Sequence, residues 1–154
     1  MKKLLLIVSL LSANAFAGDL PDSAVTPGTT NPAVTQATIN QTICVSGWTK
    51  TIRPSTSYTN KLKKQQMASA GLPGDPREYE EDHLISIELG GNPTDPKNLW
   101  PELWTGEWGA HKKDVIETRL KRMVCTGKIT LAEAQHAIAT DWIAAYKQYV
   151  PAKK

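Results

Sequence analysis

The sequence has few of the residues that usually mark a metal site or a repeat architecture. It contains only two cysteines and three histidines in 154 residues. Two cysteines cannot supply the doubled Cys-x-x-Cys spacing of a structural zinc site, which excludes a four-cysteine zinc centre. No internal repeat and no heptad pattern runs through the chain, so a solenoid and a coiled coil are excluded as well.

A long apolar run is also missing. The longest, over residues 4–11, is too short to span a bilayer comfortably. It follows Met1-Lys2-Lys3 and leads to Ala15-Phe16-Ala17, the small-x-small pattern that precedes signal-peptide cleavage. We therefore predict a signal peptide over residues 1–17, a periplasmic or secreted protein, and no membrane span after cleavage.

Overall charge says little about partners, because loss of Lys2 and Lys3 leaves 16 basic and 15 acidic side chains. The distribution of charge is more informative. Residues 44–79 carry six basic and two acidic side chains, whereas residues 80–107 carry one basic and seven acidic. Residues 111–124 are again basic. An acidic centre between basic flanks suits a cation site that faces phosphates, although ordinary solvated surface produces such blocks too.

Removal of the first 17 residues leaves 137, which is the size of one domain. Residues 18–41 are rich in Pro, Thr, Asn and Ala without apolar periodicity, and we predict a flexible leader there. Residues 42–154 are predicted to form the single domain. In an oxidising compartment Cys44 and Cys125 are expected to form a structural disulfide.

The first half of this domain is predicted from short local signals. Residues 42–45 and 51–53 are rich in β-branched side chains and are expected to be short extended pieces. Ser57 can cap a helix that continues to Ala70 and stops at Gly71.

The second half is predicted to be a hairpin followed by two helices. A strand over residues 82–89 precedes a glycine-containing loop and a second short strand around residues 98–100. Apolar residues recur at helical spacing within residues 106–125, and Thr130-x-x-Glu133 is a capping box that opens a last helix. The expected fold class is α+β.

The most informative residues are Asp82-His83, Gly90-Gly91 and Asn98. They resemble the signature of HNH nucleases. In that family an Asp-His pair on the first strand, a double glycine at the turn, an Asn on the second strand and a His on the following helix form a ββα-metal centre. Most of the remaining chain resembles small exported bacterial proteins that carry such a centre. The resemblance implies a metal-dependent endonuclease that hydrolyses phosphodiester bonds of DNA or RNA.

The chemistry fits those residue types, because phosphodiester hydrolysis needs a water nucleophile, a base and positive charge on the phosphate oxygens. The resemblance implies that His83 is the general base and that Asn98 holds the other nitrogen of its ring. Asp82 would be a metal ligand. Because adjacent residues of a strand point to opposite faces, Asp82 and His83 can share one site only if the strand is bent, bulged or very short.

The second metal ligand is expected from His111, which lies one helical turn before Val115 and can point back at the hairpin. Asn98, Glu102 or Glu107 could supply that ligand instead. An oxygen ligand suits Mg²⁺, the cofactor we expect first, or Mn²⁺, whereas a histidine ligand also tolerates Zn²⁺ or Ni²⁺.

Nucleic acid is the expected partner. The phosphate contacts are predicted at five lysines, which carry no base information and favour low sequence specificity: Lys61, Lys63, Lys64, Lys112 and Lys113. Trp104 and Trp108 flank the predicted site and are candidates for stacking on bases. His136 matches no position of the motif and is expected at the surface.

Two other functions remain open at this point. The first is a non-catalytic periplasmic or envelope binding module that keeps the ββα scaffold. The second is a glycan hydrolase that uses a carboxylate pair drawn from Glu80, Glu81 or Glu88, for which the sequence places no partner. The choice between DNA and RNA and the existence of a protective inhibitor protein are left open as well.

Overall fold

The computed structural model describes residues 19–151, and the predicted signal peptide lies outside them. The protein is a mixed α+β structure, as predicted. Its helices are α1 (Trp48–Ile52), α2 (Thr56–Ala70), α3 (Ala110–Cys125) and α4 (Leu131–Tyr149), and its strands are β1 (Tyr79–His83) and β2 (Leu99–Leu103). Within these residues the 3-10 turn η1 (Ile39–Gln41) precedes α1, and three more lie between the helices and strands: η2 (Pro76–Glu78), η3 (Ile87–Leu89) and η4 (Pro96–Asn98). Within residues 19–151, no helix is both long and apolar enough to cross a membrane.

Local capping explains where the longer helices begin and end. The capping box of Thr130 and Glu133 opens α4 as predicted. The cap of α2 is Ser55, whose hydroxyl accepts from the Tyr58 amide, two residues before the predicted cap. Gly71 ends α2 in the left-handed conformation with φ 64°. α3 begins at Ala110, four residues later than the earliest predicted position.

The two extended pieces predicted before α2 are absent from this part of the structure. Residues 42–45 form turns, and Trp48–Ile52 is the short helix α1, which follows Gly47 at φ 79°. β-branched composition alone is a weak guide, because neither segment has a neighbouring strand to pair with. As a consequence Arg53 follows a helix and not a strand.

β1 and β2 form an antiparallel pair in which Asp82 lies opposite Trp100 and His83 opposite Leu99. The long loop between them depends on Gly90 and Gly91. Gly90 has φ 75°, and a Cβ on Gly91 would collide with the carbonyl oxygen of Ile85. The double glycine is therefore required by the path of this loop.

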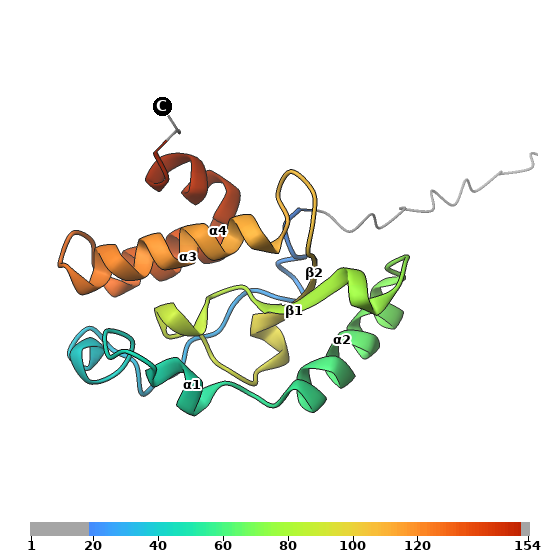
Figure 1. The fold of residues 1–154 in the computed structure, drawn as a ribbon, viewed down its shortest axis with the longest axis horizontal. Helices are drawn as coiled ribbons and strands as arrows, with labels where there is room; N and C mark the ends of the chain where they lie inside the picture. The colour runs from blue at the N-terminus through green and yellow to red at the C-terminus, as the bar shows by residue number, and fades with distance from the viewer. Residues whose placement is uncertain (1–18, 152–154) are drawn as a thin grey trace, which may run out of the picture.

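The hairpin lies between α2 on one side and the pair α3 and α4 on the other (Figure 1). α3 and α4 lie side by side, and α4 is kinked at Asp141. The apolar core fills the space between these two helices, η3 and the N-terminal segment. Its fully buried members include Ile43, Leu89, Ile116, Leu120 and Trp142.

The segment predicted as a flexible leader packs against the domain over residues 19–41. Val34 and Ile39 belong to the core with exposures of 5% and 7%. Thr30 forms an isolated bridge with Gly91, and the Trp142 indole donates to the carbonyl oxygen of Asp19. The prediction of a flexible leader was wrong here, because two well-spaced apolar residues anchor a segment whose composition is otherwise typical of a linker.

The predicted disulfide between Cys44 and Cys125 is confirmed, with Cα atoms 5.6 Å apart and a sequence separation of 81. It ties the chain just before α1 to the last residue of α3. Replacing both cysteines by serine should lower the free energy of unfolding by roughly 4 kcal/mol, because a long loop of the unfolded chain is then no longer closed. Urea unfolding of the oxidised wild type and the double variant measures this difference, and a loss below about 1 kcal/mol would contradict it.

Candidate functional site

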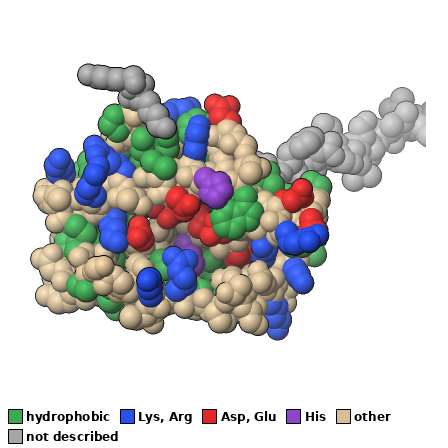
Figure 2. Space-filling view, viewed as in Figure 1, with side chains coloured by type: hydrophobic (Ala, Val, Ile, Leu, Met, Phe, Trp, Pro, Cys, Tyr) green, Lys and Arg blue, Asp and Glu red, His purple; other side chains and the backbone are tan. Residues whose placement is uncertain are grey.

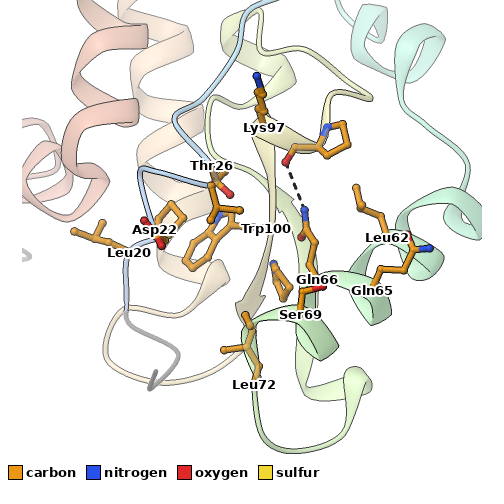
Figure 3. A pocket seen from close by; sticks show the side chains of 15 residues that line it. Leu20, Asp22, Thr26, Leu62, Gln65, Gln66, Ser69, Leu72, Lys97 and Trp100 are labelled. Atoms are coloured by element: carbon orange, nitrogen blue, oxygen red, sulfur yellow. Dashed lines mark hydrogen bonds between the residues drawn. The ribbon is translucent and has the colours of Figure 1, made fainter. Parts of the chain in front are cut away.

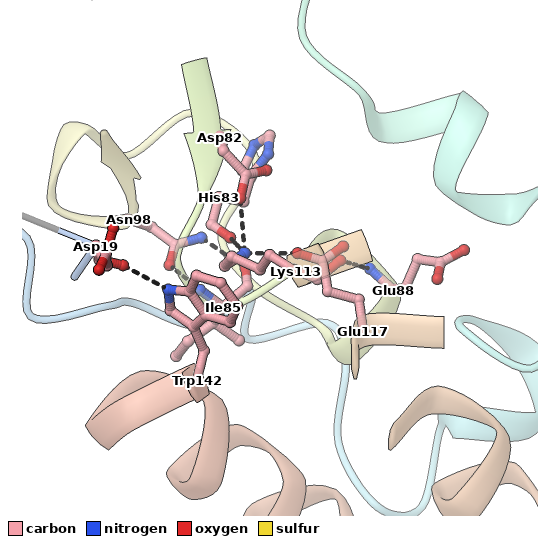
Figure 4. A network of polar contacts seen from close by, with 10 residues as sticks. Asp19, Asp82, His83, Ile85, Glu88, Asn98, Lys113, Glu117 and Trp142 are labelled. Carbon is pink, nitrogen blue, oxygen red and sulfur yellow. Dashed lines mark hydrogen bonds and ion pairs between the residues drawn. The ribbon is translucent and has the colours of Figure 1, made fainter. Parts of the chain in front are cut away.

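Asp82 and His83 end β1 on opposite faces of the strand. Burial alternates regularly along β1, so no bulge brings their side chains to one side. Asp82 points toward α3, and His83 points toward the loop that contains Pro93. The link between them is Lys113 of α3, whose ammonium group contacts both the Asp82 carboxylate and the His83 carbonyl oxygen (Figure 4).

The ring of His83 is held in one tautomer. Its Nε2 lies 3.0 Å from the carbonyl oxygen of Pro93. A carbonyl oxygen can only accept, so Nε2 carries the hydrogen and Nδ1 keeps its lone pair. No hydrogen bond joins Nδ1 to another residue within residues 19–151. Burial lowers the pKa of His83, so the imidazole is neutral near pH 7.

Asn98 does not hold the His83 ring, and the role predicted for it is corrected. Its side chain is fully buried and bonds only to main chain. The amide oxygen accepts from Ile85 and Thr29, and the amide nitrogen donates to Ile85 and Asn92. Asn98 therefore organises the loop that carries Pro93. The ring nitrogen is held by a carbonyl, which a sequence motif cannot reveal.

Lys113 is corrected from a surface phosphate contact to the centre of a buried charge cluster. It has no exposed surface. Its Nζ donates to Asp82 Oδ2 at 2.6 Å, to Glu117 Oε1 at 2.5 Å and to the His83 carbonyl oxygen at 2.7 Å (Figure 4). Three acceptors satisfy all three ammonium hydrogens. Burial alone would lower the pKa of Lys113, but attraction to Asp82 and Glu117 outweighs this effect and raises the pKa above its ordinary value.

The acidic residues of this cluster are stabilised in two ways. Some carboxyl groups are protonated, and others pair with the ammonium group of Lys113. Burial would raise the pKa of Asp82, but the ammonium group of Lys113 holds it below its ordinary value. Burial and the neighbouring Asp82 raise the pKa of Glu102 to about 10, so Glu102 is protonated at neutral pH. Burial also raises the pKa of Glu117 to about 7, against the attraction of Lys113. On the same face, burial and Asp82 raise the pKa of Glu80 to about 8.

The predicted metal pair of Asp82 and His111 is not assembled. The His111 side chain is 70% exposed, with Nδ1 4.0 Å from Asp114 Oδ2 and its ring against Trp104. Val115, which guided the prediction, is itself 45% exposed. The buried side of α3 instead contains Lys113, Ile116 and Glu117. Charged residues therefore occupy buried positions of this helix, whereas a pattern based on apolar residues alone predicts that they face solvent.

A divalent metal does not fit the donors as they stand. Within residues 19–151, no group of three or more His, Cys, Asp or Glu is arranged to hold a metal ion. Glu102, an alternative ligand, is buried near Asp82, but neither of its carboxyl oxygens has a hydrogen-bond partner among residues 19–151. The carboxylate of Asp82 is engaged by the ammonium group of Lys113.

Arg53 is a functional candidate that the sequence did not single out. It follows α1, is exposed, and its charge contributes to lowering the pKa of His83. An exposed guanidinium group whose charge acts on the imidazole is a candidate for binding an anionic group of a substrate. Correct assignment of residues 48–52 as a helix would have been needed to find it.

Of the other lysines predicted to contact phosphate, two are exposed and two already interact with groups of the protein. Lys61 and Lys64 are exposed on α2. Lys63 is buried and donates to the Tyr79 carbonyl oxygen at 2.6 Å, which corrects its predicted role. Lys112 lies over the Trp108 ring at 4.4 Å.

The two tryptophans predicted to stack on bases also differ in how accessible they are to a ligand. Trp108 packs edge-on against Trp142 and Tyr146 next to the core, whereas Trp104 lies against the exposed His111. Trp104 is thus the better placed of the two for a ligand in solution. His136 is exposed, as expected.

In the space-filling view, acidic side chains and histidine gather near the middle of one face, with lysine and arginine side chains around them (Figure 2). A separate cavity of about 710 Å³ lies between residues 20–26, α2 and Trp100 (Figure 3). Neither Asp82 nor His83 lines it. The candidate site around His83 is therefore separate from this cavity.

Comparisons with protein families, with curated proteins and with solved structures found no match to this chain.

Substituting glutamine for Glu102 should stabilise the protein near neutral pH. The pKa of Glu102 is about 10 in the folded protein against an ordinary 4.5, so folding takes up a proton. Such a group favours the folded state most at low pH and loses that contribution as pH rises between these values. The advantage of Glu102→Gln should therefore grow from about pH 5 to pH 9 and be on the order of 2 kcal/mol near pH 7.

Urea unfolding at several pH values measures this advantage, with the exposed Glu107→Gln as the matched control. An advantage that is equal at both ends of the pH range would mean that Glu102 is ionised in the folded protein.

Proposed function

We propose that this protein is an exported phosphodiesterase that acts as an endonuclease on DNA or RNA, with His83 as the general base. The observation that carries the proposal is the fixed tautomer of His83, whose Nε2 hydrogen is donated to the Pro93 carbonyl oxygen, so that Nδ1 keeps its lone pair. The order of β1, β2 and α3, with Asp82-His83 ending the first strand, supports the resemblance to HNH nucleases.

The proposed step uses only groups of this chain and water. His83 Nδ1 takes a proton from a water molecule, and the resulting hydroxide oxygen forms a bond to phosphorus. The P–O bond to the leaving oxygen breaks, that oxygen takes a proton from solvent, and the imidazolium returns its proton to solvent. Arg53 binds the non-bridging oxygens of the phosphate.

The substrate is expected to be bound mainly through its backbone. Lys61 and Lys64 on α2 are exposed and free to contact phosphates. Phosphate contacts position a nucleic acid without reading its bases, so cleavage should show little sequence preference. Outside the inner membrane such an enzyme does not meet the chromosome, which makes low specificity tolerable.

The second candidate is a non-catalytic envelope module that keeps the same scaffold. One observation favours it: His83 is only 5% exposed, so little of this residue is accessible to a substrate. A cleavage assay separates the two candidates, because only the enzyme produces new ends in plasmid DNA or RNA.

Replacing His83 with alanine should reduce cleavage by about 100-fold or more, because the base is lost. The rate is measured on supercoiled plasmid and on single-stranded RNA, with Mg²⁺, with Mn²⁺ and with EDTA. His136→Ala, an exposed histidine on α4, is the control and should cleave at the wild-type rate. Equal rates for His83→Ala and the wild type, with both folded by circular dichroism, would refute the role of His83.

Replacing Arg53 with glutamine should raise KM about tenfold, because a charged contact to phosphate is lost. It should also move the acid limb of the pH–rate profile to higher pH, since the Arg53 charge contributes to lowering the pKa of His83. Arg122→Gln, at an exposed position of α3, is the control. An unchanged acid limb would show that Arg53 does not act on His83.

A further inference from the structure

We infer that the ammonium group of Lys113 is the resident cation of this centre, occupying the place where an HNH-type site would bind a divalent metal, so that the folded protein excludes divalent cations there. The exclusion of cations is independent of any activity. Its consequence for catalysis, cleavage without a divalent metal, rests on the proposed function.

The geometry of Lys113 carries this inference. From the buried side of α3 its side chain reaches the end of β1, where its Nζ meets Asp82 Oδ2, the His83 carbonyl oxygen and Glu117 Oε1 at 2.5 to 2.7 Å. These are oxygen ligands of the kind that Mg²⁺ prefers. The ammonium group binds the expected metal ligand, Asp82, directly, and it has no exposed surface through which it could easily be displaced.

The position is already filled by a positive charge. The Lys113 ammonium group lies between the carboxylates of Asp82 and Glu117, at 2.6 and 2.5 Å, and is fully buried. A divalent cation entering here would bring its charge against this fixed ammonium group, which carries a free-energy cost.

Lys113 is a positioning residue in this arrangement. It does not reach a substrate, since all its hydrogens are engaged and it is fully buried. By binding the main chain of His83 it fixes the residue whose ring presents Nδ1. In the proposed reaction the positive charge that meets the phosphate comes from Arg53.

The test is a titration of the full mature protein with Mn²⁺, followed by paramagnetic broadening of amide NMR signals. In the wild type, signals of Asp82, His83 and Glu102 should not broaden saturably at millimolar Mn²⁺. Lys113→Met should gain a site at least about tenfold tighter than any in the wild type, because Asp82, Glu102 and Glu117 lose their cation. Lys121→Met, which removes another carboxylate-paired lysine from the same helix, should gain none at Asp82.

Saturable broadening around Asp82 in the wild type that Asp82→Asn removes would overturn the inference. So would a folded Lys113→Met that gains no Mn²⁺ site. If Lys113→Met does not fold, the wild type and Asp82→Asn decide the matter alone, because the inference predicts no site in either.

Cleavage assays test the consequence separately. Cleavage that persists in EDTA agrees with a resident ammonium, whereas cleavage that EDTA abolishes and Mn²⁺ restores contradicts it. Absence of cleavage under every condition refutes the proposed function, and the Mn²⁺ titration still decides whether Lys113 excludes the metal.

Discussion

The contact of the Lys113 ammonium with the end of β1 joins the hairpin to α3. Its three acceptors come from two elements, with Asp82 and His83 on the strand and Glu117 one turn along the helix. A buried ammonium group is tolerated only when it is paired and fully hydrogen-bonded, and here both conditions hold. Removing it would leave carboxylates without a counter-charge in the interior. The placement of Asp82 and the position of the His83 main chain both follow from this one contact.

The orientation of the His83 ring depends on a second, uncharged network. Asn98 bonds to the main chain at Ile85 and Asn92, which lie at both ends of the loop before Pro93, and also to Thr29 of the N-terminal segment. This network holds the carbonyl oxygen of Pro93 that receives the Nε2 hydrogen. Asn98 therefore acts on His83 through the backbone, and the packed N-terminal segment is part of the support for the site.

The sequence predicted the larger features well because local chemistry determines them. The capping box at Thr130, the double glycine at Gly90 and the cysteine pair each have one straightforward structural solution. Prediction failed where a tertiary partner decides the outcome. Lys63 and Lys113 have the composition of surface residues, yet each is buried because oxygen acceptors lie within reach. His111 was assigned to the wrong side of α3 because the prediction followed apolar residues alone. Two charged residues also lie on the buried side of this helix.

The central claim is that His83 stands as a neutral imidazole with Nε2 protonated and Nδ1 available as a base. Nitrogen-15 NMR of the histidine side chains tests it most directly, since the two ring nitrogens of a neutral imidazole have distinct shifts. Near pH 7 the account predicts the Nε2–H tautomer for His83 and a titration midpoint below 6.5. An Nδ1–H tautomer, or a midpoint above that value, would contradict the account.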